Sequence, residues 1–355
     1  MWTFSKKYLE ARDIKKKQIS FPEDEWAHSD ALHEWWYINS HLKTPSSSYG
    51  AYIFFSDYLI FSLTDKAEKR LIVKEKISDI RPKLTKSGIF LGNNYLRRNE
   101  GNGLSYQVSY QSNQTSFSLT LDSEKDPLLV NKNGMIREGL LGGSWYYSLT
   151  RLRANGELII DGKAEEVNGI AWLDRQWGRW EDMGIGSWIW FSIQLSNNCE
   201  ILVTEIYSPF LNKVSSRVLS VKEADSTERN ISDFAIQRLT SWKSPETGFV
   251  YGTHWRVFSS EGINLDITVD FENQEIHRGL WQGSCAVQGN FRNEKVTGVG
   301  YAEQLEKVPR SLFGLMQFCV SPYHLIFQNM LGRANLGLLD RLGRSHIFKL
   351  RQVSQ

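Results

Sequence analysis

An aspartate and an arginine stand side by side in a tryptophan-rich stretch of this sequence. Asp174 and Arg175 lie between Trp172 and Trp177, and Trp180 follows. Burial among indole rings raises the pKa of a carboxyl above its reference of about 3.9, whereas a facing guanidinium lowers it. A neutral Asp174 could donate a proton to a substrate, whereas an ionised Asp174 paired with Arg175 would be a structural clamp. The sequence leaves both interpretations open.

A second motif reads His33-Glu34-Trp35-Trp36-Tyr37. In a strand, alternate residues share a face, so His33, Trp35 and Tyr37 point one way and Glu34 and Trp36 the other. The pattern predicts that one face joins a core and the other lines a pocket. The alternative is an aromatic strand packed on both faces, with a hydrogen-bonded histidine and a neighbouring carboxylate.

Three further segments carry candidate chemistry. Residues 188–195 predict a strand with aromatic residues on both faces, and residues 281–283 read Trp-Gln-Gly. In the glycine-containing strand that follows, Tyr301 and Glu303 share one face. Histidine is the residue type that exchanges protons most readily near neutral pH, so His254 is a candidate acid or base, although a strand histidine is more often structural.

The elements that position these motifs read as β-hairpins. Apolar residues recur at period two in residues 105–121, 187–206 and 253–271, each around a polar turn. Residues 146–160 repeat the pattern, with a turn expected at residues 154–156. Short strands with frequent turns predict an all-β sandwich or barrel.

Composition limits the class of protein. The chain has 355 residues, which suggests two domains. Its 42 basic and 40 acidic residues give a net charge of +2, too balanced for a dedicated nucleic-acid binder. Apolar residues at 41% and charged residues at 23% are typical of a globular protein. Thirteen tryptophans are typical of a protein with broad, rigid aromatic surfaces.

Cysteine usage and the apolar stretches predict a cytoplasmic protein. Cys199, Cys285 and Cys319 are odd in number and far apart, so they build neither a disulfide framework nor a CxxC metal motif. Reduced thiols are typical of the cytosol. The N-terminal residues lack the pattern of a signal peptide. The most apolar stretch, residues 51–63, is too short for a transmembrane helix.

Common catalytic motifs are missing from the sequence. There is no GxSxG elbow, no GxGxxG after a strand, no HExxH and no EF-hand loop, and the seven histidines lack metal spacing. We therefore expect chemistry without a cofactor and without a metal site.

Taken in order, the motifs resemble the lipocalin-like superfamily of AttH proteins and carotenoid 1,2-hydratases (hydroxyneurosporene synthases). The resemblance covers about residues 25–305. The matching segments are residues 33–37, 145–152, 169–178, 190–195, 281–283 and 298–305. The chain departs from the pattern in having no residue between His33 and Glu34, and in having Gln282 where glutamate is common.

The resemblance implies two consecutive lipocalin-like (calycin) antiparallel β-barrels with a short C-terminal helical extension. The expected parts are a tail or helix at 1–20, barrels at 21–185 and 186–305, and an extension at 306–355. It also implies a hydrophobic small-molecule site in a barrel mouth or between the barrels. Some relatives hydrate a terminal alkene of an isoprenoid and others are cyclases or Diels–Alderases, so the fold does not fix the reaction.

Three functions follow from these observations. The leading hypothesis is a cofactor-independent enzyme that protonates an alkene of an apolar polyene or isoprenoid, followed by hydration or cyclisation. The second is a pericyclase, which folds its substrate into a reactive conformer. The third is a non-catalytic carrier of a lipid or pigment, or an aromatic platform that stacks on sugars. None of these functions involves a nucleic acid.

Each hypothesis assigns roles to particular residues. Alkene protonation needs Asp174 as the proton donor and His254 or His33 as the base. Aromatic faces would stabilise the carbocation by about 0.5–2 kcal/mol each. A pericyclase would use Arg175, or a phenol such as Tyr301, to polarise a carbonyl. The predicted substrate-binding residues are Trp35, Trp36, Tyr37, Tyr146, Trp172, Trp177, Trp190 and Trp281; Tyr37 is also a candidate donor.

The C-terminal stretch gives a side hypothesis. Residues 312–342 are rich in Leu, Phe and Met with interleaved basic residues, which is compatible with weak association with a membrane surface. The preferred alternative is a helix at 328–342 that covers the end of a barrel.

Overall fold

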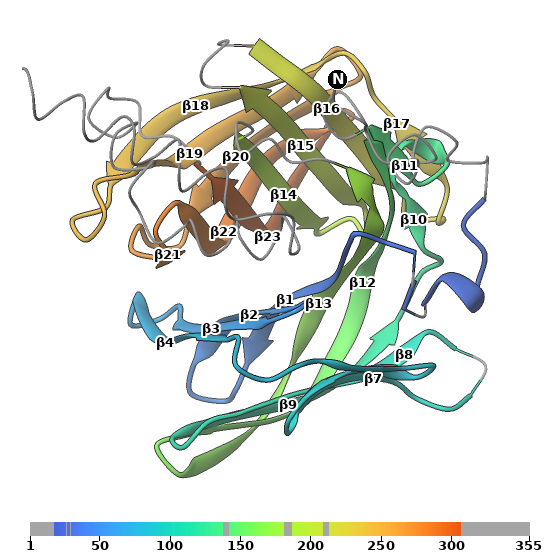
Figure 1. Cartoon of the computed structure of the whole chain (residues 1–355). Helices are drawn as coiled ribbons and strands as arrows, with labels where there is room; N and C mark the ends of the chain where they lie inside the picture. Colours follow the sequence, from blue (N-terminus) through green and yellow to red (C-terminus); the bar gives the residue numbers. More distant parts are fainter. Residues whose placement is uncertain are drawn as a thin grey trace, which may run out of the picture. The chain divides into compact units, whose positions relative to one another are not determined.

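Two antiparallel β-sheets, one from each half of the chain, build the protein (Figure 1). The computed structural model describes residues 18–25, 27–28, 30–101, 103–137, 142–180, 187–208 and 213–306. Strands dominate these residues, with short 3-10 turns at η2 (Glu23–Glu25) and η3 (Val130–Lys132), so the all-β prediction is confirmed. Most of the expected tail at 1–20, the expected helix at 328–342 and the membrane hypothesis lie outside the described residues.

The first sheet has thirteen strands in the order β4-β3-β2-β1-β13-β12-β9-β8-β7-β6-β5, with β10 and β11 paired to β12. Its strands are β1 (His33–Lys43), β2 (Ser48–Phe55), β3 (Leu59–Asp65), β4 (Arg70–Ile77), β5 (Lys83–Thr85), β6 (Gly88–Leu91), β7 (Asn94–Arg98), β8 (Ser105–Gln111), β9 (Thr115–Ser123), β10 (Leu128–Leu129), β11 (Met135–Arg137), β12 (Gly142–Ile160) and β13 (Lys163–Trp180).

The second sheet has ten strands in the order β17-β16-β15-β14-β23-β22-β20-β19-β18, with β21 paired to β22. Its strands are β14 (Ser187–Leu195), β15 (Glu200–Ser208), β16 (Lys213–Lys222), β17 (Glu228–Asn230), β18 (Phe234–Lys243), β19 (Val250–Ser259), β20 (Ile263–Val269), β21 (Glu275–His277), β22 (Leu280–Phe291) and β23 (Glu294–Leu305).

The long hairpin β12–β13 turns at Asp161 and Gly162. Both residues have positive φ, 50° and 78°, as a type I′ turn requires. The predicted turn at residues 154–156 is therefore wrong. Gly156 lies inside β12, where a Cβ would stand 1.9 Å from the backbone oxygen of Ser118, so glycine allows β9 to approach closely. The other three predicted hairpins are confirmed as β8–β9, β14–β15 and β19–β20.

Each sheet curls around an apolar core of its own. Alternate residues of a strand point to opposite faces, so in β1 Trp36 and Ile38 face the first core. Phe191 and Trp255 belong to the core of the second sheet. Burying one such large side chain contributes about 1.5–3 kcal/mol.

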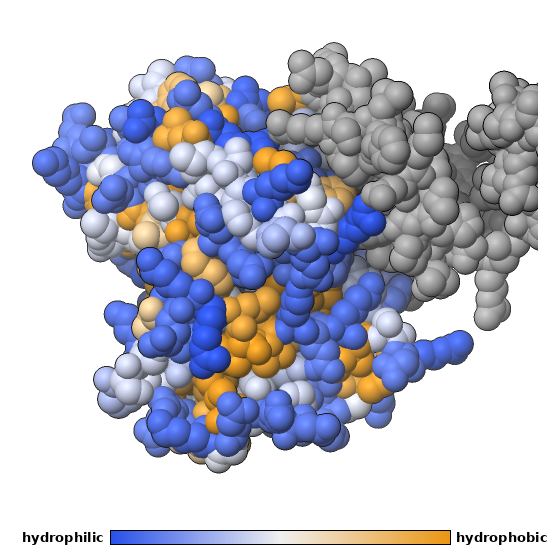
Figure 2. Space-filling model, turned by 90° about the vertical axis from the view of Figure 1, so that its left-hand side faces the viewer, coloured by the Kyte–Doolittle hydropathy of each residue, from blue (hydrophilic) through white to orange (hydrophobic). Residues whose placement is uncertain are grey.

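A third apolar cluster, which we call the central cluster, combines side chains of both sheets. Its buried members are Tyr37, Tyr52, Ile60, Leu128, Val130, Ile136, Tyr146, Trp172, Trp190, Leu202, Val218, Ile276, Leu280 and Tyr301. Partly buried Trp35, Phe54, Tyr58, Trp188 and Leu305 pack against them. On the face drawn in Figure 2, apolar side chains gather in the middle, between more hydrophilic regions. Because its members come from both sheets and its aromatic margin is only partly buried, the central cluster joins the sheets and leaves part of its aromatic surface exposed.

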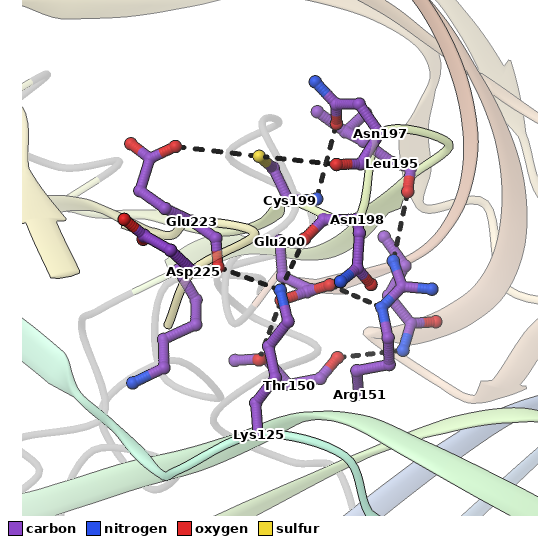
Figure 3. Close-up of polar contacts among 12 residues, drawn as sticks. Lys125, Thr150, Arg151, Leu195, Asn197, Asn198, Cys199, Glu200, Glu223 and Asp225 are labelled. Carbon is purple, nitrogen blue, oxygen red and sulfur yellow. Dashed lines mark hydrogen bonds and ion pairs between the residues drawn. The ribbon is translucent and has the colours of Figure 1, made fainter. Parts of the chain in front are cut away.

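A buried ionic cluster also joins the two sheets (Figure 3). Glu200 of β15 is 0% exposed and accepts hydrogen bonds from Lys125 Nζ at 2.8 Å and Arg151 Nε at 2.5 Å. Lys125 Nζ also donates to the backbone oxygen of Glu223 at 2.9 Å, and Arg151 to that of Leu195 at 3.0 Å. Lys125 and Arg151 of the first half of the chain thus share the carboxylate of Glu200 in the second half. Removal of that carboxylate would leave both cations without their anionic partner.

Candidate active site

Asp174 of β13 lies in the central cluster, opposite Tyr37 of β1 and Ser148 of β12. Its side chain is buried, and Oδ1 accepts hydrogen bonds from Ser148 Oγ and from Trp172 Nε1, both at 2.6 Å. Oδ2 accepts one from the Tyr146 hydroxyl at 2.5 Å. Burial raises the pKa of Asp174 to about 7, although these three hydrogen bonds act to lower it. Near neutral pH this carboxyl therefore exists partly in its protonated form.

A second carboxyl, Glu303 of β23, comes from the other sheet. Its Oε1 accepts a hydrogen bond from Trp188 Nε1 at 2.5 Å, and its Oε2 accepts one from Gln282 Nε2. Burial raises the pKa of Glu303 to about 7; the Trp188 bond lowers it, and the charge of Asp174 raises it. Among the described residues, no cation forms an ion pair with either carboxyl. The charge on Asp174 therefore favours the protonated form of Glu303.

Hydroxyl and amide groups connect the surroundings of the two carboxyls. The Tyr37 hydroxyl donates a hydrogen bond to Gln282 Oε1 at 3.3 Å. The same hydroxyl accepts a hydrogen bond from Asn39 Nδ2 at 3.3 Å. Trp190 Nε1 of the second sheet donates to the Tyr146 hydroxyl at 3.0 Å. Burial raises the pKa of Tyr37 and of Tyr146 well above the usual value, so both phenols remain neutral donors.

Aromatic rings surround this polar pair. Trp190 meets Tyr37 edge-on at a centroid distance of 5.0 Å and Trp172 at 6.3 Å. Tyr37 also packs against Tyr52 at 5.2 Å. Such rings present electron-rich faces that attract a positive charge. The arrangement combines a proton source with groups able to stabilise a carbocation.

Several residues predicted from the sequence come together here. Asp174, Tyr37, Tyr146, Trp172, Trp190 and Tyr301 lie in or against the central cluster, and Trp35 lies at its partly exposed margin. Tyr301 packs on the ring of His41 at a centroid distance of 5.3 Å. The predicted division of the first motif is also observed, because Trp35 and Tyr37 face the central cluster and Trp36 faces the first core.

Arg175 does not pair with Asp174, contrary to the clamp interpretation. Successive strand residues point to opposite faces, so Arg175 enters the core of the first sheet. There it is 0% exposed, forms an ion pair with Glu34, and places its guanidinium carbon 3.7 Å from the ring centroid of Trp36. These contacts hold it on the face opposite Asp174. The assignment of Arg175 as a donor to substrate is therefore not supported by this placement.

Three of the predicted substrate-binding tryptophans also lie elsewhere. Trp36 and Trp177 belong to the core of the first sheet. Trp281 belongs to the core of the second, where its Nε1 donates to the backbone oxygen of Glu272 at 2.7 Å. All three are packed as structural residues because each sheet needs large side chains to fill the face away from the central cluster.

The two predicted bases differ in position. His254 of β19 lies outside the central cluster, with Nε2 3.3 Å from a carboxylate oxygen of Asp266. Its assignment as the catalytic base is not supported by this placement. His33 is the first residue of β1 and shares the face of Trp35, two residues further on.

Sequence reasoning missed Glu303 as a site residue, together with Gln282, Trp188, Tyr52 and Tyr58. A signal was present, because the alternation in β23 puts Glu303 on the face of Tyr301. What the sequence could not show is that this face of β23 turns toward the first sheet.

Other site types find no support within the described ranges. No group of three or more His, Cys, Asp or Glu side chains there could hold a metal ion. No helix in the same ranges is long and apolar enough to cross a membrane. Cys199 and Cys285 are free and buried, and Cys319 lies outside the described residues.

Comparisons with solved structures identify the fold. A candidate AttH from Nitrosomonas europaea has a TM-score of 0.73 and 22% identity, covering 83% of this chain and 99% of its own. Kievitone hydratase from Nectria haematococca has a TM-score of 0.70 and 17% identity, covering 82% and 94%. CghA with Sch210972 has a TM-score of 0.51 and 11% identity, covering 79% and 89%. These similarities confirm two consecutive lipocalin-like barrel domains.

The sequence itself matches a family model, whereas no curated protein matches it. The model is that of the AttH-like family, and the match covers residues 12–305. This range contains both sheets and both carboxyls of the site. The chain therefore belongs to the AttH-like family.

Proposed function

We propose that this protein is a cofactor-independent enzyme of hydratase or cyclase type that acts on an apolar polyene or isoprenoid. The observation that carries the proposal is a pair of carboxyls, Asp174 buried and Glu303 partly exposed, each with a pKa raised to about 7 and with no compensating cation among the described residues. The similarity of its fold to that of a hydratase supports the reaction class.

In the proposed reaction, Asp174 is the acid. Its proton passes to one alkene carbon, directly or by way of the Tyr146 hydroxyl at 2.5 Å. The π electrons form the new C–H bond, which leaves a carbocation on the neighbouring carbon and a carboxylate on Asp174. Trp190, Trp172 and Tyr37 stabilise the cation through their ring quadrupoles.

Glu303 is the base of the same reaction. A water molecule that attacks the carbocation forms the C–O bond and loses a proton to the Glu303 carboxylate, which gives an alcohol. In a cyclase, an internal alkene attacks instead, and Glu303 removes a proton from carbon to regenerate a double bond. Glu303 is partly exposed, whereas Asp174 is buried, so Glu303 is the group better placed to contact water.

Turnover in heavy water tests this proposal. The purified protein is incubated in D₂O with an apolar extract of its producing cells, and the products are analysed by mass spectrometry. We expect a product with one carbon-bound deuterium, either heavier than its precursor by one water or isomeric with it. An isomeric product without carbon-bound deuterium would instead indicate a pericyclase, for which the buried phenols of Tyr37 and Tyr301 are the donors. Binding without conversion would indicate a carrier.

Matched variants identify the acid. We expect Asp174→Asn to lower kcat by about 10²- to 10⁴-fold, the usual contribution of a general acid. Asp266→Asn, which changes a partly exposed aspartate outside the central cluster, should retain activity. Full activity of a folded Asp174→Asn protein would contradict the assigned role.

A further inference from the structure

An unbroken row of cross-strand neighbours runs from the proposed acid to the edge of the first sheet. Asp174 of β13 is paired with Tyr37 of β1, Tyr37 with Phe54 of β2, Phe54 with Ile60 of β3, and Ile60 with Lys76 of β4. Neighbouring strands lie about 4.8 Å apart, so the four steps from Asp174 to Lys76 span about 19 Å measured along the sheet. The row thus has a carboxyl at one end and an ammonium group at the other.

The residues between Asp174 and Lys76 in this row carry aromatic or aliphatic side chains. Tyr37 and Ile60 are buried members of the central cluster, and Phe54 is partly exposed. The ring of Phe54 packs against that of Tyr58 at a centroid distance of 5.6 Å. Lys76 Nζ lies 4.3 Å from the centroid of the same Tyr58 ring. The aromatic surface therefore continues from the carboxyls to the ammonium group.

Lys76 differs from its neighbour on the same face of β4. Lys74 forms an ion pair with Glu246 of the second sheet at 3.1 Å. Lys76 has no ion pair with any described residue. Burial lowers the pKa of His277 on β21, and the charges of Lys76 and, to a smaller extent, Lys74 lower it further, so the field of Lys76 reaches the second sheet. The side chain of Lys76 is exposed to solvent, yet desolvation by its neighbours lowers the pKa of its ammonium group. An anion beside Lys76 would offset this cost.

Building on the proposed function, we propose that the substrate is amphipathic. Its reactive alkene lies at Asp174, its apolar chain lies over Tyr37 and Phe54, and an anionic head group, a carboxylate or a phosphate, binds Lys76. The spacing of about 19 Å along the sheet fits a long acyl or isoprenoid chain in an extended conformation.

Binding of a fluorescent polyene fatty acid tests the inference without requiring turnover. Parinaric acid and its methyl ester share the apolar chain and differ in the charged group. Titrations would compare the full-length wild type, Lys76→Gln and the matched control Lys74→Gln. We expect the wild type to prefer the acid by about tenfold, and Lys76→Gln to weaken acid binding by about tenfold with ester binding unchanged. Lys74→Gln should have a smaller effect.

The possible results separate this inference from the proposed function. Equal affinity of the wild type for acid and ester, or an equal loss of both in Lys76→Gln, would overturn the head-group site while leaving an apolar site in place. Failure of both probes to bind would contradict the apolar site and the head-group site together. Displacement of parinaric acid by a prenyl diphosphate, with no displacement by the prenyl alcohol or by inorganic pyrophosphate, would support the site and identify a phosphate head group.

Discussion

Neighbouring residues in this chain have opposite roles because strand geometry separates them. Asp174 and Arg175 are adjacent in sequence, yet one faces the central cluster and the other the core of the first sheet. Glu34 neutralises Arg175, which leaves the carboxyl of Asp174 without a cation. The sequence identified Asp174 as the candidate acid but could not decide its charge state, because that depends on which face each side chain occupies.

Arg175→Met tests whether Arg175 is purely structural. The substitution removes the guanidinium that pairs with the partly buried Glu34. Burial then raises the pKa of Glu34, and only the hydrogen bonds from His28 still lower it. We expect the free energy of unfolding, measured in urea, to fall by about 3 kcal/mol. Parinaric acid binding by the folded fraction should be unchanged. A variant that is fully stable but loses ligand binding would show that Arg175 serves the site.

At the scale of elements, hairpins bring chemistry-bearing residues from distant parts of the chain into one cluster. The pairing of β1 with β13 sets Tyr37 opposite Asp174, and the pairing of β22 with β23 sets Gln282 opposite Glu303. Between the sheets, the buried Glu200 accepts hydrogen bonds from both Lys125 and Arg151. The strand pairings thus position each carboxyl within its own sheet, and the buried ionic cluster ties the two halves together.

Glu200→Gln should therefore destabilise the whole protein and not one sheet alone. The substitution leaves the buried Lys125 without its carboxylate, which we expect to lower the free energy of unfolding by about 3–5 kcal/mol. Lys163→Gln, which alters an exposed pair with Glu165, is the matched control and should change stability by less than about 1 kcal/mol. Urea unfolding curves give both values. Equal stability of Glu200→Gln and wild type would rule out an energetic role for the buried cluster.

Much of the fold could be predicted from sequence, because hairpin signals are local. Period-two alternation around polar turns identified three hairpins correctly. The fourth failed because Gly156, which resembles a turn residue, is required by the close approach of Ser118 from β9. Contacts between distant strands carry no local signal, and this is why Glu303 was missed and Trp281 was misassigned to the site.

At the scale of the whole molecule, the site depends on the packing of two barrels. Each sheet supplies one carboxyl, and desolvation by burial raises the pKa of each. The central cluster thus joins the two halves and also creates the environment that keeps a proton on a carboxyl near neutral pH.

This arrangement makes stability depend on pH in a defined direction. The folded-state pKa values of Asp174 and Glu303 are about 7, above their ordinary values of 3.8 and 4.5. The folded protein therefore binds more protons than the unfolded chain between about pH 4 and pH 7, and stability contributed by these groups is lost as pH rises through this window. Thermal unfolding of the Asp174→Asn, Glu303→Gln double variant should show a weaker decline than wild type. Parallel curves for the two proteins would contradict the raised pKa values.

The most direct test of the central claim is infrared spectroscopy of the carboxyl groups as a function of pH. We expect a carbonyl band of protonated carboxyls at pH 6 that disappears with a midpoint near pH 7. Part of this band should be lost in Asp174→Asn and another part in Glu303→Gln. A band that is absent at pH 6, or that neither substitution changes, would show that both carboxyls are already ionised and that the site has no acid to donate a proton.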